Sequence, residues 1–131
     1  MYPMYVRAES SADISDAADT TQYTIYAPFK GVIRLDECFL RWTEATGTQT
    51  TTAGVISISV AGTEVATLTA GVSLAIGKTQ RFTSTTPATN PKDPYIEFAA
   101  DDAIVIKTKT QAVDGTITGD GDVFLHLELG I

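Results

Sequence analysis

The single histidine is the first residue to consider for catalysis. His126 lies in the run Val123–Leu129 and could nominally act as the base of a Ser-His-Asp triad. A triad also needs a nucleophile and an acid that orients the base. No nucleophile of this sequence lies on a recognisable sharp turn. We therefore interpret His126 as a surface or interface histidine, and we predict that the protein is not an enzyme.

Two acidic segments are candidates for cation binding. Segment Asp114–Asp122, DGTITGDGD, has the composition of a calcium loop but not the spacing of an EF-hand. Asp and Gly also favour ordinary turns, because Gly accepts positive φ and Asp hydrogen-bonds its own backbone. Asp101 and Asp102 are adjacent, so in a strand they would point to opposite faces. One histidine and one cysteine are too few for a zinc site, and we expect no metal.

Aromatic side chains could serve a different chemistry, the stacking of sugar rings. Trp42 and Tyr95 are the candidates for such a platform. The alternative is that they belong to the core, because aromatic residues dominate the burial of small β domains. No glycine-rich phosphate cradle follows a strand and opens a helix, so we expect no cofactor.

The charge balance bears on the class of partner. The 131 residues carry a net charge of −7, and the nine Lys and Arg residues form no cluster. Nucleic-acid binding needs clustered positive charge, so we expect none. Mean hydropathy is +0.07, and the longest apolar runs fall far short of the ~18 residues of a membrane span. We predict one domain, no membrane span and no secretory signal.

Short runs with a period of two predict the fold class. In Val123–Leu129 every second residue is apolar, which places those side chains on one face of a strand. Only Ser11–Ala18 suggests a short helix. The expected strands lie within Met4–Arg7, Gln22–Ala27, Val32–Thr43, Gly54–Ala61, Glu64–Thr69, Lys78–Thr83, Tyr95–Phe98, Ala103–Thr110 and Val123–Leu129. With long connections at 44–53 and 84–94, this pattern predicts an all-β, antiparallel, jelly-roll-like sandwich.

The first 21 residues differ from the rest of the chain. Tyr2, Met4 and Tyr5 precede a polar, acidic run. A solvated tail gains nothing from exposed Tyr and Met side chains, so we expect residues 1–21 to dock as an extended arm. Residues 22–131 would then form the sandwich. Docking on another subunit and packing on its own domain are both open alternatives.

Three segments carry a resemblance to a known family. They are GVISISVAGTEVATLTAG at 54–71, YIEFAADDAIVIKTKT at 95–110 and GDGDVFLHLELG at 119–130. Together they resemble small jelly-roll proteins of tailed bacteriophages, with Phe98, Asp102, Ile104 and Ile106 forming the start of a characteristic strand. Asp101 stands where the more usual form has glycine. The resemblance covers residues 54–131.

The resemblance implies a virion structural protein, of the kind that decorates (cements) the outer surface of a phage capsid. Such a protein would be a homotrimer that binds the major capsid protein. The capsid contacts we expect are Tyr2, Met4, Tyr5 and Arg7. The alternative is a receptor- or carbohydrate-binding module of a head fibre or tail fibre, with Trp42 and Tyr95 as stacking residues.

Overall fold

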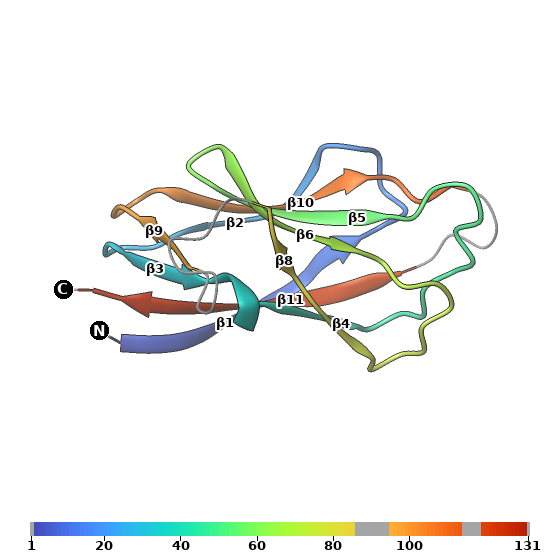
Figure 1. Ribbon diagram of the computed structural model, residues 1–131, viewed down its shortest axis with the longest axis horizontal. Helices are drawn as coiled ribbons and strands as arrows, with labels where there is room; N and C mark the ends of the chain where they lie inside the picture. Colours follow the sequence, from blue (N-terminus) through green and yellow to red (C-terminus); the bar gives the residue numbers. More distant parts are fainter. Residues whose placement is uncertain (1, 86–94, 114–118, 131) are drawn as a thin grey trace.

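The computed structural model describes residues 2–85, 95–113 and 119–130 as two antiparallel sheets packed face to face (Figure 1). Sheet A contains β1 (Tyr2–Asp13), β3 (Gly31–Arg34), β4 (Phe39–Trp42), β7 (Thr79–Arg81), β9 (Tyr95–Phe98) and β11 (Asp120–Leu129). Sheet B contains β2 (Thr20–Tyr26), β5 (Val55–Val60), β6 (Thr63–Thr69), β8 (Thr83–Ser84) and β10 (Ala103–Thr110). The chain crosses repeatedly between the two layers. The predicted all-β, antiparallel sandwich is therefore confirmed.

Strand β11 is the centre of sheet A. One of its edges pairs with β1, and the other edge pairs with β3 near one end and with β4 near the other. Val123, Leu125 and Leu127 are buried, whereas Phe124 and His126 between them point to the outer face. The alternation predicted for this run is confirmed. It arises because successive side chains of a strand lie on opposite faces.

The long apolar run Val32–Thr43 is two strands rather than one. A 3₁₀ turn, η1 (Leu35–Glu37), separates β3 from β4. Both strands follow the same edge of β11, so the turn acts as an insertion within one long pairing. The sequence had predicted a single strand within this run, and the 3₁₀ turn divides it.

The hairpin predicted at Gly54–Thr69 is present as β5 and β6. Val60 pairs with Thr63, which leaves Ala61 and Gly62 as a two-residue loop. Both loop residues have positive φ, +50° and +84°. This geometry belongs to a type I′ turn, whose twist matches that of the flanking strands.

The predicted helix at Ser11–Ala18 is wrong. Ser11 to Asp13 belong to β1, and turns follow. The Ser11 hydroxyl donates to the Ala8 carbonyl, and the Asp13 carboxylate accepts from the backbone N–H and hydroxyl of Ser15. Such local side-chain bonds offer the backbone an alternative to helical hydrogen bonds.

Within the segment predicted as an arm, residues 2–13 are extended, and the structure shows where they dock. β1 pairs with β11 of its own chain from Tyr2 to Asp13. Of the two alternatives left open by the sequence, packing on its own domain is the one observed. Figure 1 shows the two termini side by side at one end of the sandwich.

A single apolar core fills the space between the sheets. Trp42, Leu125 and Ile106 are among its fully buried side chains. Cys38 also lies in this core, and burial raises the pKa of its thiol to about 12. Cys38 is therefore an uncharged, inert thiol. No helix in the described ranges is long and apolar enough to cross a membrane.

Truncation of the central core residue tests this packing. Leu125→Ala should lower the free energy of unfolding by about 2–5 kcal/mol, because it removes buried methyl groups and leaves a cavity. Urea denaturation measures the change. Val72→Ala, at an exposed position, is the control and should leave the transition midpoint unchanged. Equal stability of both variants would contradict a tightly packed core around β11.

Candidate functional site on the outer face of sheet A

Four aromatic rings form a continuous row on the outer face of sheet A. Tyr5 lies opposite His126 in the β1–β11 register, and Phe39 lies opposite Phe124 in the β4–β11 register. Ring centroids are 4.6 Å apart for Tyr5 and His126, 6.5 Å for Tyr5 and Phe39, and 4.7 Å for Phe39 and Phe124. The row therefore crosses three strands. Tyr5, which contacts both His126 and Phe39 in this row, is 57% exposed.

All four arginines of the chain lie on this same face. Two of them lie opposite rings of the row in the strand register, Arg7 opposite Phe124 and Arg81 opposite Phe39. The other two lie opposite residues outside the row, Arg41 opposite Asp122 and Arg34 opposite Tyr95. Aromatic residues and arginine are the types enriched at protein interfaces. We call the four rings and the four arginines the aromatic–arginine face.

The arginines differ in how they are held. Arg34 bonds Glu128 at 3.0 Å and lies 5.4 Å from the Tyr95 ring centroid. Arg81 donates to the Asp36 carbonyl at 3.1 Å. Arg41 is exposed and has no ion pair with a described carboxylate. The charges of Arg41 and Arg81, on either side of Phe39, are thus available to a partner.

His126 lies inside the row rather than in a catalytic arrangement. Its Nδ1 contacts the Glu37 carboxylate, and its ring lies against Tyr5. Only 12% of the side chain is exposed. The interpretation of His126 as a surface or interface histidine stays a prediction, because a neighbouring chain would have to cover the little surface that the ring exposes.

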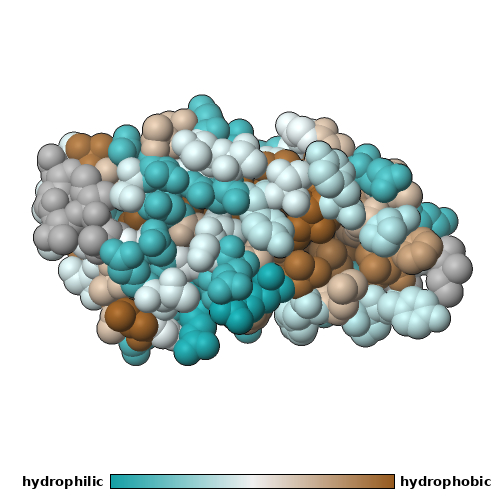
Figure 2. Space-filling model, turned by 180° about the vertical axis from the view of Figure 1, so that it is seen from behind, coloured by the Kyte–Doolittle hydropathy of each residue, from teal (hydrophilic) through white to brown (hydrophobic). Residues whose placement is uncertain are grey.

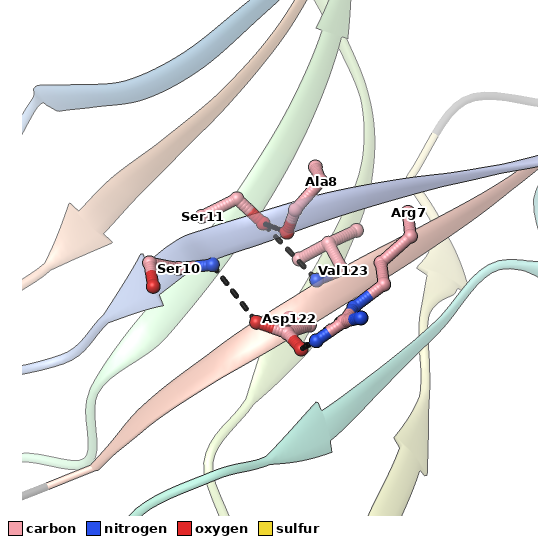
Figure 3. Close-up of polar contacts among 6 residues, drawn as sticks. All are labelled: Arg7, Ala8, Ser10, Ser11, Asp122 and Val123. Atoms are coloured by element: carbon pink, nitrogen blue, oxygen red, sulfur yellow. Dashed lines mark hydrogen bonds and ion pairs between the residues drawn. The ribbon is translucent and has the colours of Figure 1, made fainter.

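The position of β1 depends on one buried carboxylate (Figure 3). Arg7 donates to Asp122 Oδ2 from Nε at 3.1 Å and from a terminal nitrogen at 2.9 Å. The Ser10 backbone N–H donates to Asp122 Oδ1 at 2.8 Å. The three residues Glu9–Ser11 lie opposite the single residue Asp122, because the register shifts between Ala8 and Ala12. Asp122 therefore fixes a bulge in β1.

A second side chain completes this lock. The Ser11 hydroxyl donates to the Ala8 carbonyl at 2.7 Å and accepts from the Val123 backbone N–H at 3.0 Å. It thereby supplies partners to backbone groups that the bulge removes from the ladder. Ser10, with φ of +53°, takes the left-handed conformation that the bulge requires.

Substitution at Asp122 tests the lock. Asp122→Ala should lower the free energy of unfolding by about 1.5–3 kcal/mol, the range for hydrogen bonds to a charged group. The ion pair between Asp122 and the exposed Arg7 side chain adds little to the free energy of unfolding, because water screens the Arg7 charge. Asp122→Asn keeps an acceptor for the Ser10 backbone N–H, so it should lose less stability than Asp122→Ala. Urea denaturation gives both values, and an Asp122→Ala transition identical to the wild type would show that the bulge holds without this carboxylate.

The four contact residues predicted from the sequence divide between the two faces of β1. Tyr5 and Arg7 belong to the aromatic–arginine face, whereas Tyr2 and Met4 lie opposite Leu129 and Leu127, on the inner side. The split follows from the strand period of two. An arm that is not paired in a sheet would not divide these four residues between two faces.

The proposed sugar-stacking pair does not form a platform. Trp42 has no exposed surface, and its indole N–H donates to Gln80 Oε1 at 2.9 Å. Trp42 is thus a core residue, which corrects the stacking role considered for it. Tyr95 is half-buried beside Arg34.

Sequence reasoning missed Phe39, Phe124, Arg41 and Arg81 as members of the site. The alternation in Val123–Leu129 already placed Phe124 and His126 on the face opposite the leucines. The cross-strand register that brings Phe39 and Arg81 beside them has no signal in the sequence.

Three carboxyl groups meet at the other end of β11. Asp120 lies opposite Asp13 and hydrogen-bonds the side chains of Asp13 and Glu44. Burial, together with the neighbouring charges of Asp13 and Glu44, raises the pKa of Asp120 to about 6. No group of three His, Cys, Asp or Glu within the described ranges is arranged to hold a metal ion. Residues 114–118 of the candidate calcium loop lie outside those ranges.

The Asp120 pKa predicts a pH dependence of stability. Between the ordinary pKa of 3.8 and about 6 the folded state binds more protons at Asp120 than the unfolded state does. The contribution of Asp120 to stability therefore falls as the pH rises through this window. The free energy of unfolding of Asp120→Asn, relative to that of the wild type, should rise as the pH increases from 4 to 6. Above pH 6 the difference between the two proteins should be constant. Parallel urea titrations at each pH measure this, and a difference independent of pH would contradict it.

Comparison of the chain with protein-family models, with curated proteins and with solved structures finds no match.

Proposed function

We propose that this protein is a structural binding protein that attaches to a larger protein assembly through the aromatic–arginine face. One observation carries the proposal: a contiguous row of four rings, beside all four arginines, on the solvent side of a sheet. Tyr and Arg are the residue types that most often dominate binding energy at protein contacts.

A purely structural role would account for only part of this face. Cross-strand aromatic pairs stabilise a sheet by about 0.2–1 kcal/mol each, and Phe39 with Phe124 fits that role. Such pairing does not require the exposed position of Tyr5, nor two arginines beside Phe39 that form no ion pair with any carboxylate of the described residues. Arg41 and Arg81 fit acidic side chains on a partner that also covers the rings.

We further propose, from the resemblance at residues 54–131, that the assembly is the outer surface of a phage capsid and that the protein decorates it as a homotrimer. Its action would be thermodynamic. A protein that binds the assembled shell and not its separate subunits stabilises the shell by mass action. The capsid contacts then include Tyr5 and Arg7 from the original prediction, together with Phe39, Arg41 and Arg81.

Gene neighbourhood gives the first test of the capsid target. The proposal expects a major capsid protein to be encoded near this chain. A neighbourhood of unrelated genes would contradict the capsid as the target. The proposed binding face would then be tested on another assembly.

Co-sedimentation with empty heads assembled from that neighbouring major capsid protein tests the face. The double variant Arg41→Glu with Arg81→Glu should lose at least about tenfold in affinity, because it places carboxylates against the acidic partner groups. The control reverses two lysines on the outer face of sheet B, Lys107→Glu with Lys109→Glu. Both doubles change the net charge equally, so an equal loss in both would indicate a general charge effect and overturn the proposed face.

A further inference from the structure

Exposed apolar side chains gather on one side of the sandwich. Nine large hydrophobic residues are exposed within the described ranges. Six of them belong to β1, β2 or the connection that follows β2: Tyr2, Met4, Tyr5, Tyr23, Tyr26 and Phe29. β1 and β2 are edge strands, one of each sheet. We call segments Tyr2–Ala8 and Thr20–Lys30 together the open side.

Core-facing residues of the open side are left uncovered. Tyr2 is 64% exposed although its partner in the register, Leu129, packs against the core. Tyr2, Phe29, Leu129 and Gly130 line a hollow of about 400 Å³. Figure 2, the view from behind, shows an apolar hollow toward the end at which the termini lie. Apolar surface of this kind marks a site of protein contact.

The backbone of β1 offers a second means of contact. One edge of β1 pairs with β11, and no described strand pairs with the other edge over Tyr2–Ala8. Free N–H and C=O groups along a strand edge are a template for another strand. A second copy of this chain presents the same free edge, flanked by the same apolar side chains.

Charge favours a second copy meeting at this side rather than elsewhere. Each chain carries a net charge of −7, so two copies repel wherever their carboxylates face one another. Neither Tyr2–Ala8 nor Thr20–Lys30 contains Asp or Glu, although the chain has 16 of these residues. The two segments of the open side therefore contribute no carboxylate of their own to a contact between two acidic chains.

We propose that the open side is a contact between copies of this chain, in which the free edge of β1 and the apolar side chains around Tyr26 and Phe29 are covered by a neighbouring copy. The contact deepens the proposed function by naming the surface at which copies of the proposed homotrimer meet, and it requires no capsid or other target. Its failure and the failure of target binding are therefore distinguishable.

Sedimentation of the whole chain tests the contact, at concentrations from about 1 to 100 μM to cover micromolar affinities. The expected mass is a multiple of 13.9 kDa. Tyr26→Ser with Phe29→Ser should weaken association by at least about tenfold, as loss of central aromatic contacts does. Val72→Ser with Ile76→Ser removes equally exposed apolar residues away from the open side and should leave the mass unchanged.

A mass of 13.9 kDa at every concentration would overturn the proposal, and so would equal weakening by both double variants. Urea denaturation of each variant confirms that it is folded. Hydrogen exchange tests the contribution of the β1 backbone edge to the contact separately from that of the side chains. Amides of Met4–Ala8 should exchange more slowly as chain concentration rises, and rates independent of concentration would exclude pairing through the β1 edge.

Discussion

The pairing of the first strand with the last is the interaction on which the other features depend. β1 lies along one edge of β11, and the Asp122 carboxylate holds it there by bonding Arg7 and the Ser10 backbone. Without this pairing Tyr5 would not reach His126, and the row of rings would be broken between His126 and Phe39. The inner side of β11 would also lose the cover that Val6 and Ala8 provide. By holding β1 in place, Asp122 thus supports both the core contacts of Val6 and Ala8 and the outer-face position of Tyr5.

Strand alternation gives β1 two different surfaces. Tyr5 and Arg7 lie on the outer face of sheet A with three other arginines, and Tyr2 and Met4 lie on the inner side at an uncovered edge. The two proposed contacts use these two surfaces. An assembly partner and a second copy could therefore bind one chain at the same time, with β1 contributing to both contacts.

Charge is unevenly distributed over the fold, and this limits which surfaces can meet. The arginines are confined to one face, and the open side has no acid. Asp13, Glu44 and Asp120 meet near the opposite end of β11, where repulsion and burial raise the pKa of Asp120. Electrostatic complementarity fixes orientation and partner choice more than affinity. Aromatic burial would therefore supply most of the binding energy at either contact.

The sequence by itself determined most of the strands, the inward and outward faces of Val123–Leu129 and the β5–β6 turn, because these follow from local patterns: a period of two and a glycine between two strand-like runs. It also singled out Tyr2, Met4, Tyr5 and Arg7, although not the division between them. The tertiary structure alone decided that residues 2–13 pair with 120–129, that Trp42 is buried, and that Phe39, Arg41 and Arg81 join Phe124 on one face. Register between strands that are more than 100 residues apart is set by packing and by side chains such as Asp122. No local period encodes those contacts.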